Sequence, residues 1–202
     1  MNFLAHIYLS GPSEGVILGN FMADGIRGKD YLQFPTEIQK GILLHRFIDT
    51  FTDAHPTFRL SKHRLHDKYG HYAGVITDIL YDHFLAINWE RYHPTPLEMY
   101  AESFYELLLR HYELLTERTQ KMFPYMKARN WLVSYASLEG LEMILFQMQH
   151  RTQHRVPMKE ATADIEIHYD TFQQEFESFF EEIQLACQEK LKELSLAFPS
   201  SL

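Results

Sequence analysis

Apolar residues recur three or four positions apart along most of this 202-residue chain, and no segment shows the two-residue alternation of a half-buried strand. The clearest example follows Thr36, which can cap the start of a helix. Its apolar positions are Ile38, Ile42, Leu43, Phe47, Ile48 and Phe51. This spacing lies on one face of a helix, because a turn contains 3.6 residues. The pattern predicts an all-α fold, a helical bundle.

Proline, glycine and small polar residues set the expected ends of the helices. Ser13 can cap a helix that starts near Glu14 and runs to about Asp24, and His55–Pro56 breaks the long helix that follows Thr36. Further helices are predicted at about 58–70, 74–89, 97–115, 128–136, 138–150 and 158–194. No Gly/Ser-rich or charged linker separates them, so we expect a single domain over residues 1–202.

The composition narrows the class of protein. A hydrophobic fraction of 46% is ample for a buried core. The net charge of −8 disfavours general attraction to nucleic acid or anionic membranes, and no apolar run reaches the ~18 residues of a membrane span. Cys187 is the only cysteine, which excludes an internal disulfide and a cysteine-based zinc site and favours a cytoplasmic location. The oligomeric state stays open.

Two of the predicted helices carry acidic and histidine side chains among apolar neighbours. His45 and Asp49 lie four residues apart, as do Asp78 and Asp82, so each pair lies on one side of its helix. Buried carboxylates cost free energy unless they are paired, and a shared cation would pair them. Ordinary surface ion pairs, or an Asp78 that favours a helix dipole, are the alternatives. The presence of two such rows favours a metal site.

The kind of metal follows from the ligands. Asp24 lies at a helix end between glycines and could join the set, although such a residue is often a helix cap. Asp and His without thiols suit Mn²⁺, Mg²⁺ or Fe²⁺, and these ions promote hydrolysis of phosphoesters. Arg27 and Arg46 could bind phosphate oxygens, or could only neutralise the carboxylates.

Six motifs occur in order along the chain: MNFLAH at the start, GN-x-x-AD-x-x-RG at 19–28, H-R-x-I-D-x-x-T-D at 45–53, D-x-x-x-D-H-F-L at 78–85, W-L-V-x-Y at 131–135 and H-Y-D at 168–170. Together they resemble the acyl carrier protein phosphodiesterase family. The resemblance implies a helical fold related to the HD-domain phosphohydrolases. It also implies a Mn²⁺-assisted hydrolysis that releases 4′-phosphopantetheine from the serine of holo acyl carrier protein.

The resemblance also suggests site residues. The implied metal ligands are Asp24, His45, Asp49, Asp78 and Asp82. Catalytic roles are predicted for His45, Asp49, Arg46 and His83, and substrate binding for His6, Arg27, Arg59, Lys62 and Arg64. The adjacent His-Asp pair of HD proteins is absent, because three residues separate His45 from Asp49 and the order is reversed at Asp82–His83. Two alternatives for the metal geometry therefore stay open: a distorted HD-like site with one or two ions, or a site that has lost tight metal binding.

An acidic carrier protein would need a basic surface on this acidic chain. The cations at 59–68, with Arg27 and Lys29, form the predicted docking face, or are ordinary solvated side chains. Two other functions fit the same residues. One is a phosphohydrolase for another phosphoester such as a nucleotide, which would act without carrier; the other is a non-catalytic carrier-binding protein, which would bind without turnover.

Overall fold

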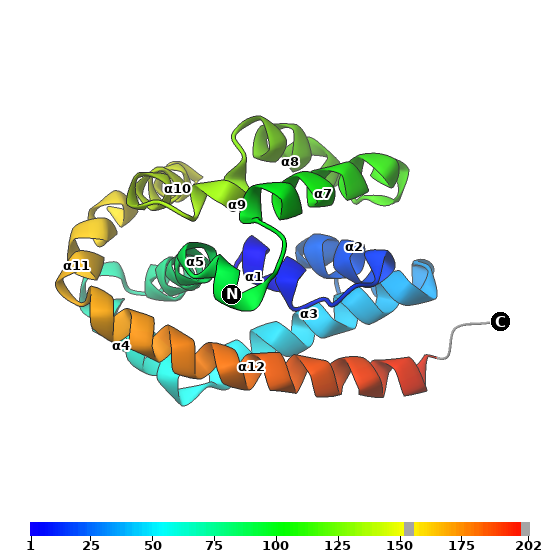
Figure 1. Ribbon diagram of the computed structural model, residues 1–202, viewed down its shortest axis with the longest axis horizontal. Helices are drawn as coiled ribbons and strands as arrows, with labels where there is room; N and C mark the ends of the chain where they lie inside the picture. Colours follow the sequence, from blue (N-terminus) through cyan, green and yellow to red (C-terminus); the bar gives the residue numbers. More distant parts are fainter. Residues whose placement is uncertain (152–155, 199–202) are drawn as a thin grey trace.

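Figure 1 shows the computed structural model, which describes residues 1–151 and 156–198. Within these ranges the chain forms α-helices and short 3-10 helices and no β-strand, so the predicted all-α fold is confirmed. None of the helices in this part of the chain is both long and apolar enough to cross a membrane. The helices are, in order, α1 (Phe3–Tyr8), α2 (Glu14–Met22), η1 (Ala23–Gly25), η2 (Asp30–Gln33), α3 (Thr36–Ala54), α4 (Pro56–Tyr69), α5 (Tyr72–Ile87), α6 (Trp89–Tyr92), α7 (Leu97–Arg110), η3 (Tyr112–Leu114), α8 (Glu117–Ala128), α9 (Trp131–Ser134), α10 (Leu138–Arg151), η4 (Met158–Glu160), α11 (Ala161–Ile167) and α12 (Tyr169–Ala197).

The helices lie in three tiers in the view of Figure 1. α1, α2 and α5 occupy the middle, α3, α4 and α12 lie below them, and α7, α8 and α10 lie above. α5 is buried on nearly every side, as expected of a helix that is apolar all round. Its fully buried apolar residues include Ile76, Ile79, Leu80, Phe84 and Leu85. α12 packs a row of buried rings into the same core, Phe172, Phe176, Phe179 and Phe180.

The backbones of α2 and α3 touch. A Cβ added to Gly19 would lie 2.1 Å from a backbone oxygen of α3, and one added to Gly41 would lie 2.2 Å from a backbone oxygen of α2. No side chain larger than hydrogen fits at either position, so these glycines set the separation of the two helices. The close approach brings Asn20, the neighbour of Gly19, beside His45, which lies one turn after Gly41.

Several predicted helix ends agree with the structure. The Ser13 side chain accepts a hydrogen bond from Val16 N at the start of α2, and α3 ends at Ala54. Gly70 ends α4 with φ 53°, a conformation that favours glycine. The predicted helix at 138–150 corresponds to α10.

Three predicted helices differ from the structure. The helix expected at 97–115 ends at Arg110, and that expected at 158–194 is divided at His168, whose backbone leaves the helical region. The helix expected at 128–136 is a turn followed by the four-residue α9, because Asn130 adopts φ 44°. α8 was not predicted; it contains Pro124, a residue that opposes a helix interior.

Candidate metal centre

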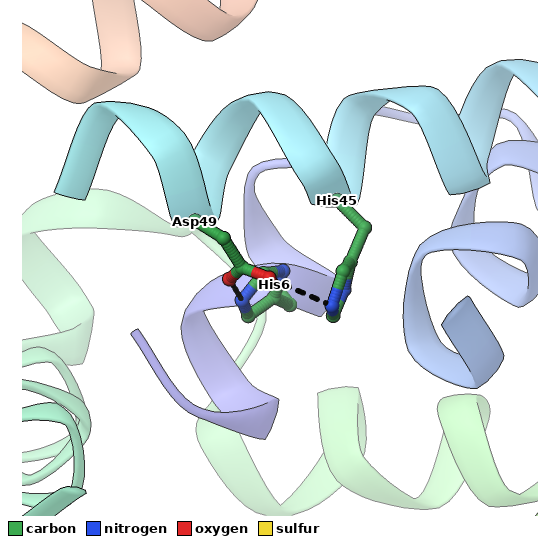
Figure 2. A group of neighbouring side chains, drawn as sticks. All are labelled: His6, His45 and Asp49. Atoms are coloured by element: carbon green, nitrogen blue, oxygen red, sulfur yellow. Dashed lines mark ion pairs between the residues drawn. The ribbon is translucent and has the colours of Figure 1, made fainter. Parts of the chain in front are cut away.

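Three side chains from α1 and α3 converge at one point, as Figure 2 shows. His45 and Asp49 lie one turn apart on the same side of α3, and His6 of α1 reaches them. His6 Nε2 is 3.3 Å from Asp49 Oδ1, and His45 Nε2 is 3.2 Å from Asp49 Oδ2. The two imidazole rings stack with centroids 4.3 Å apart. One possible ligand atom of each residue lies within 4.8 Å of the others.

Asn20, a fully buried residue of α2, orients both imidazoles. Its Nδ2 donates to His6 O at 2.9 Å and to Ser10 Oγ at 2.8 Å. A carbonyl oxygen only accepts, so the amide nitrogen faces it and Oδ1 faces the rings. The Nδ1 atoms of His6 and His45 donate to this oxygen at 2.8 Å and 3.1 Å. Each ring therefore presents Nε2 to the carboxylates, as a metal-binding imidazole would.

The carboxylates set the charge of the cluster. Burial lowers the pKa of His45, but hydrogen bonds with Asp24 and Asp49 outweigh this and raise it to about 9. Burial lowers the pKa of His6, so this ring is neutral at pH 7. Burial would raise the pKa of Asp49, but its hydrogen bond with His45 holds it far below its usual value. The cluster thus contains an ionised carboxylate beside two nitrogens, one of which holds a proton that a cation could replace.

This donor set fits a divalent cation. Two imidazole nitrogens and a carboxylate, without thiolate, are ligands that Mn²⁺, Fe²⁺ and related ions accept. Three protein ligands also leave coordination positions for oxygen atoms of a substrate or water. The residues therefore support binding of a divalent metal ion.

Asp24 extends the cluster toward α8. Its Oδ1 lies 3.3 Å from His45 Nε2, and its Oδ2 lies 3.5 Å from Arg118 Nη2. The hydrogen bond with His45 lowers the pKa of Asp24, so the carboxylate is ionised at neutral pH. About half of its side chain is exposed. Since the Asp49 side chain is exposed to the same extent, a substrate can reach either carboxylate.

Asp78 and Asp82 of α5 bind the backbone at the start of α1 and do not belong to the cluster. Asp82 is fully buried, and its two carboxylate oxygens accept hydrogen bonds from the backbone N–H groups of residues 2, 4 and 5. Asp78 accepts a hydrogen bond from the Met1 amino group at 2.6 Å. A carboxylate in this place satisfies N–H groups that have no partner within the helix. Since α1 carries His6, both residues act on the cluster through the position of that helix.

Two residues predicted to be catalytic lie outside the cluster. His83 Nδ1 is 2.7 Å from Tyr135 O, and its Nε2 is 2.7 Å from the hydroxyl of Tyr169. Arg46 donates to the backbone oxygens of residues 26 and 28, and its guanidinium packs over the ring of Tyr31. His83 therefore ties α5 to α9 and α12, and Arg46 ties α3 to the loop after η1.

The cations predicted to bind substrate differ in their surroundings. Arg64 makes a forked ion pair with Glu175, with both N···O distances 2.8 Å. Arg27 and Arg59 are exposed and Lys62 is half-buried, and none of these three forms an ion pair within the described residues. Lys62 lies beside Gly74, next to the pocket wall formed by Val75. Arg59 and Lys62 are thus available on α4 for a partner, and Arg64 is not.

The cluster lies in a pocket of about 390 Å³, which we call the metal pocket. Its walls come from α1, α2, η1, α3, α5 and α10, so segments far apart in the sequence close around the cluster. Asp78 forms part of the wall, as do Thr52 and Asp53 of α3. Its volume is ample for a phosphoryl group, and the pocket is open to solvent.

Two residues of the site were not predicted. Asn20 lies one turn before Asp24 in the GN-x-x-AD motif, and that spacing was its only signal in the sequence. Arg118 belongs to α8, the helix that the sequence pattern did not predict. No local signal connects Arg118 with Asp24, because the two residues meet only through the packing of α8 over η1.

Comparisons with known proteins agree on one family. A family model described as "Acyl carrier protein phosphodiesterase" matches residues 1–183. Proteins of the same name are similar over most of their length: that of Photorhabdus laumondii is 33% identical over 89% of this chain and 91% of its own. That of Yersinia enterocolitica is 32% identical over 94% of this chain and 99% of its own. An Escherichia coli protein of that name is 29% identical over 89% of this chain and 94% of its own. No solved structure matches.

Proposed function

The chain belongs to the acyl carrier protein phosphodiesterase family, and from this premise we propose that it hydrolyses the phosphodiester between 4′-phosphopantetheine and a serine of holo acyl carrier protein in the cytoplasm. Water adds to phosphorus and the bond to the serine oxygen breaks. The products are the apo carrier, with a serine hydroxyl, and 4′-phosphopantetheine. The chemistry of the pocket supports this reaction.

The observation that carries the proposal is the orientation of His6 and His45 by Asn20 beside Asp49. These three residues would hold the divalent ion, for which we propose Mn²⁺, with Mg²⁺ or Fe²⁺ as alternatives. When bound, such an ion neutralises phosphoryl oxygens and lowers the pKa of water. Asp24, ionised and half-exposed, would accept a proton from water at Oδ1 or Oδ2.

We assign the phosphate contact to Arg118. It lies beside Asp24 with about half of its side chain exposed, and its guanidinium can donate two hydrogen bonds to phosphate oxygens. Arg46 is less suited, because its donors are bound to backbone oxygens. For Asp78, Asp82 and His83 we propose positioning roles, since their side chains hold α1 and α9 in place.

Intact-mass spectrometry of holo acyl carrier protein tests this function. The carrier is incubated with purified protein and Mn²⁺, with Mn²⁺ plus excess chelator, and with the Asp49→Asn variant and Mn²⁺. We expect loss of the phosphopantetheine mass in the first reaction alone. An unchanged carrier in all three, with folded protein that binds Mn²⁺, would reject the function.

The same reactions separate the alternatives. A nucleotide phosphohydrolase would leave the carrier intact and hydrolyse small phosphoesters without it. A carrier-binding protein would form a stable complex with the holo carrier and leave its mass unchanged.

A further inference from the structure

A second hollow adjoins the metal pocket. It has a volume of about 170 Å³ and is lined by residues of α8, α9 and α10 together with part of the metal-pocket wall. The shared wall consists of Asn2, Phe3, Asp24 and Met148. We call this hollow the Trp131 groove. Since one set of side chains borders both spaces, a substrate with its phosphorus at the metal cluster can extend into the groove.

The walls of the groove combine apolar and polar groups. Phe3 and Trp131 lie with ring centroids 6.1 Å apart, and Ile144 adds an aliphatic surface. Asn2 and Gln147 add amide groups, which can donate to and accept from an amide. Small-molecule sites have this character, with mostly apolar walls and a few polar groups that fix orientation.

Unpaired polar atoms also occur here. Among the residues that the structure describes, Thr52 Oγ1 and Trp131 Nε1 are the two buried side-chain polar atoms without a hydrogen-bond partner. Thr52 lines the metal pocket and Trp131 lines the groove. Buried polar atoms are normally paired, so each is a place where an occupant could supply the missing partner. For Trp131 Nε1, which only donates, that partner is an acceptor such as a carbonyl oxygen.

We propose that the Trp131 groove binds the pantetheine arm of the substrate, a conclusion that rests on the proposed function. The arm is a narrow chain with a dimethyl group and two amides, so it offers apolar surface to Phe3 and Trp131 and carbonyl acceptors to the unpaired indole N–H. A groove this small admits a narrow chain and excludes a protein surface. The carrier then lies outside the groove, and Arg59 and Lys62 of α4, which form no ion pair within the described residues, are available to it.

The first test measures binding of pantetheine, which has no phosphate and no bond to cleave. The chain has two tryptophans, and Trp89→Phe leaves Trp131 as the only indole. We expect pantetheine to change Trp131 emission saturably in the Mn²⁺-loaded protein. An unchanged emission at millimolar pantetheine, with circular dichroism of a folded protein, would overturn the proposal.

The second test blocks the groove. Gln147→Phe places a ring in it, whereas Gln174→Phe makes the same change at an exposed position of α12. We expect Gln147→Phe to raise KM for the holo carrier about tenfold with little change in kcat, as loss of a remote contact does, and to leave the Mn²⁺ affinity unchanged. Gln174→Phe should alter neither. Equal KM values for the two variants would overturn the groove assignment.

The two proposals fail in different ways. If wild-type protein does not cleave the holo carrier, the proposed function fails whatever pantetheine does. If wild-type protein cleaves it while pantetheine neither binds nor competes, the groove assignment alone fails.

Discussion

The amide oxygen of Asn20 accepts a hydrogen bond from His45 Nδ1 at 3.1 Å, and the same oxygen accepts one from His6. Asn20 therefore acts on both imidazoles without being a ligand itself. Loss of such an orienting group typically lowers metal affinity by about 10–100-fold. We expect this loss for Mn²⁺ in Asn20→Ala, measured by isothermal titration calorimetry. Asn88→Ala, which removes an amide that donates to Phe84 O away from the cluster, is the control. Equal affinities for the two variants would contradict the assignment.

Asp49 is the carboxylate shared by His6 and His45. In Asp49→Asn we expect the Mn²⁺-dependent activity to fall by about two orders of magnitude or more, because a ligand and its charge are both lost. The rate of carrier cleavage is the measurement. Asp67→Asn, which neutralises an exposed acid on α4, should retain the wild-type rate. Full activity of Asp49→Asn would exclude this residue from the site.

Asp82 should make the free energy of unfolding decrease as the pH rises. Burial raises its pKa to about 7 in the folded protein, whereas an unfolded Asp titrates near pH 4. Between about pH 4 and pH 7 the folded state binds more protons than the unfolded state. The contribution of Asp82 to the free energy of unfolding is therefore fully present below about pH 4 and is lost as the pH rises through about 7. In Asp82→Asn, the fall in unfolding free energy between about pH 4 and pH 7 should therefore be smaller than in the wild type. Urea denaturation at several pH values measures it, and parallel curves would contradict the expectation.

The backbone contact of α2 with α3 makes Gly41 sensitive to substitution. A Cβ there would lie 2.2 Å from a backbone oxygen, so Gly41→Ala must push the helices apart. We expect destabilisation of about 1–3 kcal/mol, the range for overpacked cores, together with weaker Mn²⁺ binding as His45 moves from Asn20. Gly74→Ala is the control. Gly74 lies inside α5, and a Cβ there would make an ordinary 3.5 Å contact with the Lys62 side chain of α4. It should be neutral or slightly stabilising.

The paired and unpaired cations of α4 should behave differently. Arg59→Glu combined with Lys62→Glu should raise KM for an acidic carrier and weaken the dependence of KM on salt, since both cations are available for docking. Arg64→Ala should instead lower the melting temperature, because it leaves the partly buried Glu175 without its partner. Steady-state kinetics at two salt concentrations and thermal denaturation distinguish these results. An unchanged KM for the double variant would place the carrier elsewhere.

Local patterns in the sequence predicted those features whose physical causes are local. Ser13, Pro56 and Gly70 mark real helix ends, because capping and backbone conformation depend on a few neighbouring residues. The same reasoning was wrong for the helix expected at 128–136, because Asn130 adopts a conformation that its own sequence does not require. His45 and Asp49 were paired correctly because both lie on one helix.

The sequence by itself determined the all-α class, most of the helices and the family, since helical periodicity and the order of the motifs can be read from the residues alone. The tertiary structure alone decided which polar side chains meet. Asp82 has the same helical spacing as Asp49, yet it binds the backbone of α1, while His6 joins the cluster. That outcome depends on how α1, α3 and α5 pack, and the packing follows from contacts between residues far apart in the chain, which no local pattern encodes.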